Sequence, residues 1–403
     1  MVLFGHPTGN PNSHQAALAH YEHGQLEAFC VPWFPSEAEL GVLSLFPTSK
    51  AEVARLKRRR FEPLAKAPKI QGRVGEWRRM AVRLAGRSDQ RLSYEANDWL
   101  MRTMARECRR KSVSAVHSYE DCSLWQFEEA RRHGKTCIYD MPTCYYPWWQ
   151  EKENELLAKY ARWLPESGVE AHRWVRPDQK VREMELADVV LAPSSFVKRT
   201  ILERCDKEVR VCVYGADTPS FGDYLASSPT PVDTVRFLHI GQCSVRKGTP
   251  FLLELWRRLG LRHAELVIAG TWNLSASLLK ELPRGVSYVG VLDPLSLREL
   301  YASGHVLLFP SFADGFGLVM IEAMAAGMSV IGSVTSGAPD IASSCCVATV
   351  DAGDEDAWAA AIEDSVHSIR TSGHIRDAAL ECARAMNWDG YREAVGEVMA
   401  DLV

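Results

Sequence analysis

What the chain lacks excludes several classes of protein. No apolar run approaches the ~18 residues that a membrane-spanning helix needs. The opening residues, MVLFGHP, have neither the basic segment nor the long apolar stretch of a secretion signal, so we expect a mature start. The net charge of -4 at pH 7 lacks the positive excess of a dedicated nucleic-acid binder, and we expect no nucleic-acid partner.

The pattern of cysteines argues against a metal site. Eleven cysteines are scattered through the chain without the spacing of a zinc site, so no metal site is predicted. Several lie in apolar, strand-like settings, such as Cys137 and Cys212. Buried free thiols of this kind are typical of a reducing cytoplasm. The adjacent pair Cys345–Cys346 has no functional interpretation.

Alternating strand-like and helical segments dominate the 403 residues, and this pattern predicts an α/β fold with parallel sheets covered by helices. A first series ends near residue 217, and a second begins at VRFLHIG. Between them the sequence is rich in Pro, Ser and Thr, as in a linker. We therefore expect an N-terminal domain over 1–217, a linker over 218–233, a C-terminal domain over 234–385 and a terminal helix over 386–403.

Residues 50–87 depart from the average composition. They contain thirteen Lys and Arg against three Glu, a local excess of +10 (13 minus 3), and apolar residues interleave with the charges. One interpretation is a solvated helical face. The other is an amphipathic surface that docks on anionic lipid.

The strongest functional signal lies in residues 305–333, which predict a strand, a turn, a helix and a second strand. The turn, Asp314 to Gly317, follows the carboxyl end of the first strand, where open α/β sheets bind ligands. Its glycines let the backbone approach a ligand, and the helix N-terminus offers N–H groups to an anion. Asp314 and Glu322 suit hydroxyl groups at two points of one ligand.

The string DGFGLVMIEAMAAGMSVIG resembles the signature of the retaining glycosyltransferases of family 4, also called group 1, in which a carboxylate precedes a Glu by eight positions. The resemblance implies a GT-B fold, with two Rossmann-like domains facing each other across a cleft and a C-terminal helix crossing back. It implies that Asp314 contacts the transferred sugar, although the family usually has the longer Glu there. Glu322 is then the ribose contact, and Gly315, Phe316, Gly317 and Leu318 hold the nucleotide sugar.

A second site is predicted in FLHIGQCSVRKGTPFLLELW, where Arg246 and Lys247 lie in a strand-to-helix loop. Two adjacent cations suit a diphosphate, because Arg binds it as a fork and Lys as a point charge. The family commonly has an Arg after the glycine that corresponds to Gly241, and this chain has Gln242. The resemblance also makes the backbone of Val291 a candidate contact to the nucleobase.

The N-terminal half carries weaker signals. Gly9 follows the first strand, where the family keeps a glycine loop near the transferred phosphate and sugar. There is no full GxGxxG, which disfavours an NAD oxidoreductase. Asp140 occupies the strand end where many members have His, so it is either a hydroxyl-binding group that contacts donor or acceptor, or a cap or turn residue. His117 is interpreted as a core residue.

An aromatic cluster follows Asp140 and comprises Tyr145, Tyr146, Trp148 and Trp149. Aromatic faces stack on sugar rings, and such clusters also pack between domains. The sequence leaves both alternatives open.

The resemblance implies transfer of a hexose-type sugar from a UDP- or GDP-linked donor to a glycan or lipid-linked acceptor, with retention of configuration. No metal or other cofactor is expected, since no DxD motif is visible in the second half. The alternatives are a nucleotide-sugar epimerase and a non-catalytic nucleotide-sugar-binding module; a polysaccharide phosphorylase would need a pyridoxal lysine, for which we find no clear candidate. Bacterial polysaccharide or glycolipid assembly is the expected context, in the cytoplasm, with the basic stretch suggesting peripheral attachment to the inner membrane.

Overall fold

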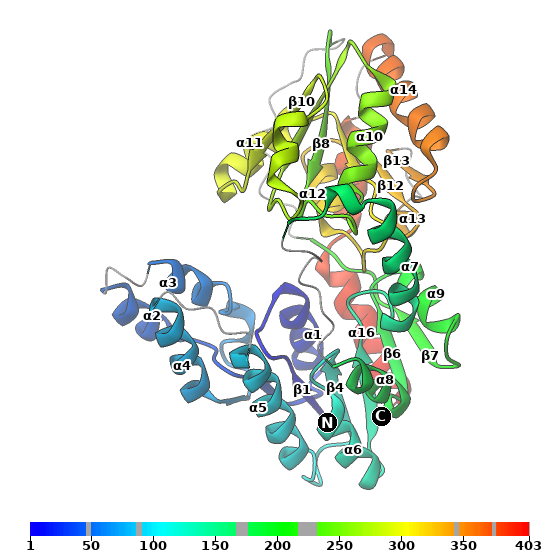
Figure 1. The fold of residues 1–403 in the computed structure, drawn as a ribbon. Helices are drawn as coiled ribbons and strands as arrows, with labels where there is room; N and C mark the ends of the chain where they lie inside the picture. The colour runs from blue at the N-terminus through cyan, green and yellow to red at the C-terminus, as the bar shows by residue number, and fades with distance from the viewer. Residues whose placement is uncertain are drawn as a thin grey trace.

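The computed structural model describes residues 1–45, 50–85, 91–166, 176–216, 232–341, 346–372 and 376–402. Each half of the chain builds one parallel sheet, and helices cover both faces of each sheet (Figure 1). The expected α/β class is therefore confirmed. The predicted linker 218–233 falls almost entirely outside the described residues, and so does Cys345.

The N-terminal sheet has seven strands in the order β3-β2-β1-β4-β5-β6-β7. The strands are β1 Val2–Gly5, β2 Leu26–Val31, β3 Lys69–Gln71, β4 Ala115–Tyr119, β5 Thr136–Asp140, β6 Val189–Ala192 and β7 Glu208–Val211. The helices are α1 Pro11–Glu22, α2 Glu37–Ser44, α3 Lys50–Lys57, α4 Arg73–Leu84, α5 Arg91–Glu107, α6 Leu124–Arg132, α7 Tyr146–Lys159, α8 Pro177–Leu186 and α9 Ser195–Leu202, with short 3-10 turns η2 Glu62–Leu64 and η3 Ala161–Trp163. Strand β3 was not predicted, because it is short and lies inside the basic stretch.

The C-terminal sheet has six strands in the order β10-β9-β8-β11-β12-β13. The strands are β8 Val235–Ile240, β9 Ala264–Ala269, β10 Val286–Gly290, β11 Val306–Phe309, β12 Ser329–Ser333 and β13 Val347–Val350. The helices are α10 Thr249–Leu259, α11 Pro294–Ser303, α12 Leu318–Ala325, α13 Ala338–Ile341, α14 Glu355–Ser372 and α15 Arg376–Ala385, with the 3-10 turn η5 Ala276–Glu281.

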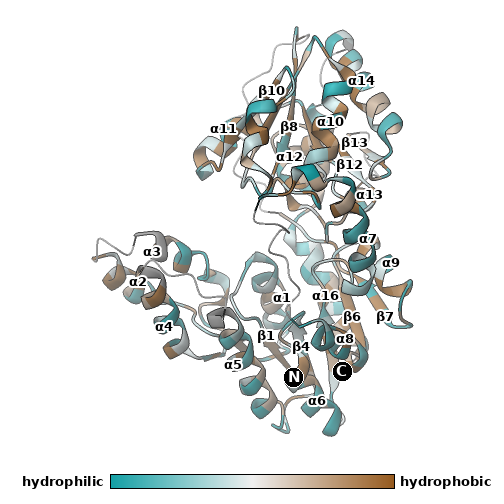
Figure 2. Cartoon of the chain, viewed as in Figure 1, coloured by the Kyte–Doolittle hydropathy of each residue, from teal (hydrophilic) through white to brown (hydrophobic). Residues whose placement is uncertain are grey.

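Local sequence explains where these elements begin and how they are buried. Asn10 and Ser13 form a capping box at the start of α1, with Asn10 Oδ1 accepting from the Ser13 N–H at 2.8 Å, and Pro11 occupies the first helical turn. The central strands β1 and β11 are buried along their whole length, as expected when helices cover both sheet faces. Figure 2 shows the same contrast, with hydrophobic strands and mixed helices.

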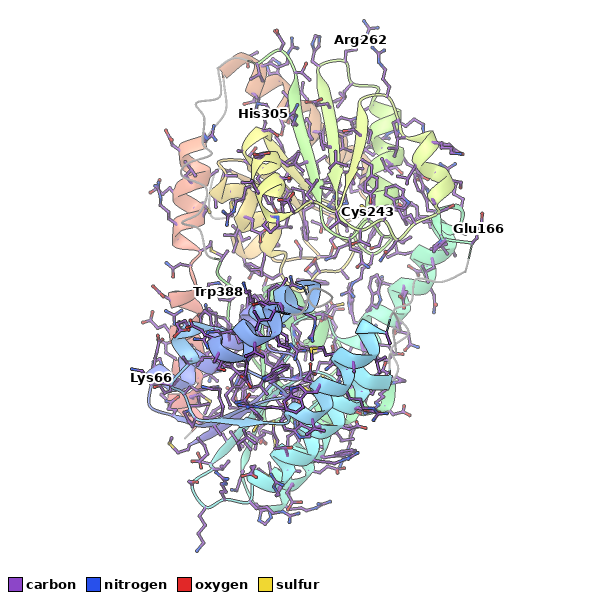
Figure 3. The ribbon with its side chains drawn as sticks, turned by 90° about the vertical axis from the view of Figure 1, so that its left-hand side faces the viewer. Lys66, Glu166, Cys243, Arg262, His305 and Trp388 are labelled. Carbon is purple, nitrogen blue, oxygen red and sulfur yellow. The ribbon has the colours of Figure 1, made fainter. Side chains whose placement is uncertain are left out.

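The last helix, α16 Trp388–Leu402, returns to the N-terminal domain and packs on α1, as expected from the sequence (Figures 1 and 3). Arg392 joins the two helices, since its Nε lies 2.9 Å from Glu22 Oε2 and its Nη1 lies 2.7 Å from Gln15 Oε1. Upstream, the Ala216 N–H donates to the Met386 carbonyl at 3.0 Å. The end of the chain is thereby tied to the segment that leaves the N-terminal domain.

A segment of the N-terminal half also packs into the C-terminal domain. Tyr160 and Trp163 follow α7 in the N-terminal half, yet both are buried in the hydrophobic core of the C-terminal domain. Trp163 Nε1 donates to Glu254 Oε1 at 2.8 Å, and the Ser275 N–H donates to the Trp163 carbonyl at 2.8 Å. The η3 turn lies within the predicted N-terminal domain 1–217 but packs with the C-terminal domain.

The positive charge of residues 50–87 is partly neutralised by a glutamate of the same stretch. Glu76 on α4 is 1% exposed, and Arg59 Nη1 lies 2.7 Å from its Oε2 while Arg79 pairs with its Oε1. Removing such cations would leave a buried charge without compensation, which is costly. Neither interpretation of the sequence included this role. Across the described ranges, no helix combines the length and apolarity that crossing a bilayer requires.

The tie between residues 214–216, which leave the N-terminal domain, and the terminal helix depends on Gly215. A Cβ at this position would lie 2.2 Å from the Asn387 carbonyl carbon and 2.4 Å from the Trp388 nitrogen. We expect Gly215→Ala to lower the free energy of unfolding by ~1–3 kcal/mol, because backbone atoms must move apart. The matched control is Gly390→Ala on α16, where a Cβ meets nothing within 4 Å. It should be neutral or stabilising by up to ~1 kcal/mol. Equal stability of the two variants in urea unfolding would contradict this account.

Candidate functional site

A pocket of about 330 Å³ lies between the two domains, a volume that suits a small ligand. The C-terminal domain lines it with residues from the β8 end and the turn after β11. The N-terminal domain contributes Asn12, Pro142 and Tyr214. Both sheets therefore present the ends of their strands to one cavity, as open α/β sheets do when they bind ligands.

The turn between β11 and α12 forms the floor of this pocket. Gly317 has φ +93°, and a Cβ there would lie 2.8 Å from the Phe309 ring, so only glycine fits without strain. Leu318 and Val319 line the pocket from the first turn of α12. The first N–H groups of a helix have no intrahelical partner, so this end of α12 offers donors to an anion. The predicted residues Phe316, Gly317 and Leu318 thus lie at the pocket.

Lys247 and Asp314 lie side by side on the C-terminal wall of the pocket. Lys247 Nζ forms an ion pair with Asp314 Oδ2, and Lys247 Nζ also lies 5.6 Å from the centroid of the Phe309 ring. Asp314 Oδ1 accepts the Phe316 N–H at 3.1 Å. The side chains of Lys247 and Asp314 are 27% and 13% exposed, so both face a partly desolvated space. The structure brings together these two predicted residues.

Two glycines shape the loop that carries Lys247. Gly241 lines the pocket with φ +137°, and its contact with the nucleotide sugar stays a prediction. Gly248 follows Lys247 with φ +72°, and a Cβ there would lie 2.0 Å from the Pro310 carbonyl oxygen. This close approach holds the Lys247 loop against the end of β11, so that Lys247 reaches Asp314.

Gly315 lies at the contact between the domains, and its predicted contact with the nucleotide sugar is not tested by this position. It does not line the pocket, and a Cβ there would lie 1.8 Å from the Pro142 carbonyl oxygen of the other domain. Its own carbonyl accepts a hydrogen bond from Ser194 Oγ at 2.6 Å. Gly315 is therefore one of the points at which the two domains touch, while its neighbours Asp314 and Phe316 line the pocket.

Arg246 also faces the domain contact instead of the pocket. Its Nε donates to the Ala313 carbonyl at 2.9 Å, and its guanidinium carbon lies 5.1 Å from the centroid of the Trp149 ring. Its Nη2 lies 3.8 Å from Cys144 Sγ. Contact with a diphosphate stays a prediction for Arg246, and it requires the guanidinium to leave Trp149.

The other aromatic residues after β5 support the packing alternative. Tyr145, Tyr146 and Trp148 are all buried. Trp148 Nε1 donates to Glu203 Oε2 at 2.8 Å, and its ring meets Phe196 edge-on with centroids 5.3 Å apart. In this conformation their faces are covered by protein.

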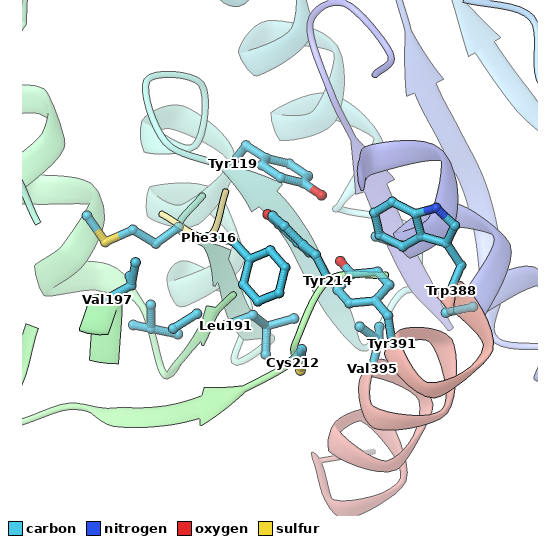
Figure 4. Packing of buried hydrophobic residues seen from close by; sticks show 14 of the residues in the cluster. Tyr119, Leu191, Val197, Cys212, Tyr214, Phe316, Trp388, Tyr391 and Val395 are labelled. Atoms are coloured by element: carbon cyan, nitrogen blue, oxygen red, sulfur yellow. The ribbon is translucent and has the colours of Figure 1, made fainter. Parts of the chain in front are cut away.

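Asp140 lies beneath the pocket, not in it. The residue is 2% exposed, and the hydroxyls of Tyr119, Tyr214 and Tyr391 lie near its carboxylate. These three tyrosines come from separate segments and point toward one another in Figure 4. Burial raises the pKa of Asp140 to about 7, and the approach of the Tyr119 and Tyr391 hydroxyls offsets part of the rise. Tyr391 of α16 and Tyr214 cover the carboxylate in this structure, and its contact with a substrate stays a prediction. His117 lies in the same buried group, with Nε2 3.6 Å from Asp140 Oδ2.

Gly9 and Val291 also lie outside the pocket lining. Gly9 has φ +66°, and its N–H donates to His6 Nδ1 at 2.9 Å, so it shapes the loop after β1. Asn12, three residues later, is the group from that loop that lines the pocket. Val291 is 72% exposed beyond the end of β10. Its contact with a nucleobase stays a prediction.

Glu322 lies on the second turn of α12 and does not line the pocket. Its Oε2 accepts the Tyr301 hydroxyl of α11 at 2.7 Å, which holds the carboxylate between the two helices. The predicted ribose contact is neither made nor excluded by this position. Within the described residues, no group of three or more His, Cys, Asp and Glu side chains is placed to hold a metal ion.

Some lining residues were not predicted. His239 at the end of β8 is buried and bonded on both ring nitrogens, to the Leu308 carbonyl at 3.1 Å and to Thr249 Oγ1 at 2.9 Å. Burial lowers its pKa to about 4, so the imidazole is neutral at pH 7. Its place at the end of an apolar strand was a usable signal. Asn12 and Tyr214 carry no such signal, because they reach the pocket from the other domain.

Comparison with known proteins agrees with this geometry. Residues 234–368 match the family model described as glycosyl transferases group 1. The chain is 26% identical over 167 residues to a sulfoquinovosyl transferase of Arabidopsis thaliana, covering 38% of this chain and 32% of that protein. It is 28% identical over 251 residues to O-antigen chain mannosyltransferase B of Escherichia coli, covering 53% of this chain and 62% of that protein. The chain thus spans less than two thirds of the length of these relatives.

Solved structures share the whole architecture. Sucrose-phosphate synthase from Thermosynechococcus elongatus superposes with a TM-score of 0.65 at 16% identity, covering 100% of this chain and 98% of that one. HepE of Anabaena, in complex with UDP, gives a TM-score of 0.61 at 13% identity, covering both chains completely. At these identities the likeness establishes the fold, which is GT-B with two Rossmann-like domains.

The buried Asp140 predicts a pH dependence of stability. Its folded pKa of about 7 lies above the ordinary 3.8, so between these values the folded state keeps a proton that the unfolded chain releases. Stability from this group is full below pH 4 and is lost as pH rises to 7. We expect Asp140→Asn to gain ~1–3 kcal/mol over the parent between pH 4 and pH 7.5. If the unfolding free energies of the parent and of Asp140→Asn change with pH in parallel, this prediction is wrong.

Proposed function

We propose that this chain, whose residues 234–368 belong to the group 1 glycosyltransferases, transfers a hexose-type sugar from a nucleoside diphosphate sugar to an acceptor hydroxyl with retention of configuration. The observation that carries the proposal is the pocket between the domains. It combines Lys247, Asp314 and the N-terminal end of α12 with a wall from the acceptor-side domain. The family match does not favour the alternatives of an epimerase or a non-catalytic binding module.

The donor diphosphate is placed at the start of α12. Its phosphate oxygens accept from the backbone N–H groups there and interact with Lys247. The ion pair of Lys247 with Asp314 holds the ammonium at the pocket until a phosphate replaces the carboxylate. Asp314, released in part, then accepts a hydrogen bond from a hydroxyl of the sugar.

Transfer breaks the bond between the anomeric carbon and the β-phosphate oxygen and forms a bond from that carbon to the acceptor oxygen. Negative charge develops on the leaving diphosphate, where Lys247 and the α12 N–H groups stabilise it. The acceptor hydroxyl proton passes to the leaving phosphate oxygen, which balances the reaction without a protein base. Attack and departure on the same face give retention.

UDP or GDP is the proposed nucleotide, and no metal takes part in this scheme. HepE, which shares the fold, was solved with UDP, and this supports a uridine nucleotide as the first candidate. Similarity to an O-antigen mannosyltransferase supports bacterial polysaccharide or glycolipid assembly, in the cytoplasm, as the context.

Lys247 provides the direct kinetic test. Lys247→Ala should lower kcat/KM for the donor by ~10²–10³-fold, since it removes one charged stabiliser of the leaving group. The fold should persist, because the side chain is partly exposed. Lys280→Ala, at an exposed position of η5, is the matched control and should retain full activity. A kcat/KM of Lys247→Ala within threefold of the parent value would contradict the proposed glycosyltransferase site.

Attachment of the 50–87 stretch to an anionic membrane remains a proposal. Its support is the local charge of +10, reduced by internal pairs such as Arg59 with Glu76. In flotation with vesicles, we expect binding to phosphatidylglycerol that falls as salt rises, because surface charges are screened. Binding that is equal on neutral vesicles and insensitive to salt would contradict it.

A further inference from the structure

Tyr214 belongs both to the pocket between the domains and to the buried group around Asp140. It lines the pocket together with Asn12, and its ring packs against Phe316 of the turn before α12, with centroids 5.9 Å apart. Tyr214 is only 4% exposed, and its hydroxyl lies near both Asn12 and Asp140. A change at Asp140 therefore has a direct route to the N-terminal wall of the pocket.

The position of the Tyr214 ring is fixed by its surroundings. The next residue, Gly215, lies so close to α16 that a Cβ there would be 2.2 Å from the Asn387 carbonyl carbon. The Tyr214 ring also packs edge-on against Tyr391 of α16, with centroids 5.5 Å apart (Figure 4). Because the ring is held on these sides, the freedom that remains is rotation of the hydroxyl group.

Asp140 is the member of this group that changes its charge near neutral pH, because burial raises its pKa to about 7. The other titratable groups that face it, or face its tyrosines, come from the loop after β1, from α1 and β4, from residues 212–214 and from α16. Burial disfavours their charged forms, which lowers the pKa of each imidazole and raises the pKa of each phenol and of the thiol. These neutral groups are His6, His20, His117, Tyr119, Cys212, Tyr214 and Tyr391.

The protonation state of Asp140 decides which hydrogen bonds the Tyr214 hydroxyl can make. An ionised carboxylate only accepts, so it draws nearby hydroxyls toward itself. A neutral carboxyl group donates its own proton, and this leaves the Tyr214 hydroxyl available to Asn12 and the pocket. The ionised form also places a negative charge behind the wall of a pocket that is proposed to hold a diphosphate.

We propose that Asp140 is a positioning residue that acts through Tyr214 and Asn12 on the N-terminal wall of the pocket, and that its neutral form favours binding of the nucleotide sugar. This role rests on the proposed function and adds a buried proton that controls donor affinity. Linkage sets the direction of the effect. A donor that prefers the protonated protein binds more weakly as the pH rises through the pKa of Asp140.

Isothermal titration of the full chain between pH 5.5 and pH 8.5 measures this effect. UDP-glucose and GDP-mannose are the probes, because their diphosphates keep the same charge over this range. For the probe that binds, we expect the dissociation constant to rise by ~5-fold or more from the lowest to the highest pH. Asp140→Asn has no proton to lose at this position, so its dissociation constant should stay the same.

Two tyrosine variants form a matched pair. Both hydroxyls lie near Asp140, but Tyr214 lines the pocket and Tyr391 does not. Tyr214→Phe keeps the ring and should abolish the pH dependence of binding. Tyr391→Phe should keep that dependence with its midpoint at higher pH, because the Tyr391 hydroxyl lowers the pKa of Asp140.

Donor affinity of the parent that does not change with pH, or a change that persists in Asp140→Asn, overturns the positioning role while donor binding still supports the proposed function. Equal pH dependence in the two tyrosine variants also overturns it, since the effect then does not pass through Tyr214. Failure of both nucleotide sugars to bind the parent at every pH contradicts the proposed function, and this role with it. Melting temperatures of all variants check folding, and the tyrosine pair decides the question if Asp140→Asn does not fold.

Discussion

The turn from Asp314 to Gly317 serves both domains at once. Gly315 lies against Pro142 of the N-terminal domain at a distance that admits no side chain, and Ser194 binds its carbonyl. Asp314 and Gly317, on either side, face the cavity. The lack of a Cβ at Gly315 lets the two domains approach closely beside the pocket. Arg246 on Trp149 extends the contact, so side chains of the C-terminal loops both close the interface and form the pocket.

The charged groups of the pocket wall, Lys247 and Asp314, determine which ligands it can bind. A lone ammonium or carboxylate in a partly desolvated space is costly, and the pairing of Lys247 with Asp314 removes that cost in the absence of ligand. The pairing also holds the Lys247 ammonium near the N-terminal end of α12, which carries a partial positive charge. In the proposed reaction, the donor diphosphate replaces Asp314 as the partner of Lys247, and the freed carboxylate binds the sugar. The same pair therefore stabilises the pocket wall and has a role in the proposed reaction.

Several C-terminal residues that line the pocket could be predicted from the sequence, because the elements that carry them follow one another in the chain. A strand, a glycine turn and a helix follow one another in the chain, and Lys247 lies in the equivalent turn after β8. Residues whose role depends on distant segments could not be located in this way. Asp140 was expected at a substrate, but Tyr391, contributed by the terminal helix, covers it. Arg246 was expected at the diphosphate, but Trp149 across the interface holds it. Asn12 and Tyr214 were missed because only the meeting of the domains brings them to the pocket.

The central claim is that the pocket between the domains binds a nucleoside diphosphate at the start of α12. The most direct measurement is the melting temperature of the chain with a panel of nucleoside diphosphates, without added metal. A ligand that binds the folded state raises this temperature by mass action. The account predicts a clear rise with UDP or GDP and a much smaller rise with the corresponding nucleoside, which has no diphosphate to bind. No rise with any diphosphate, or an equal rise with the nucleoside, would contradict it.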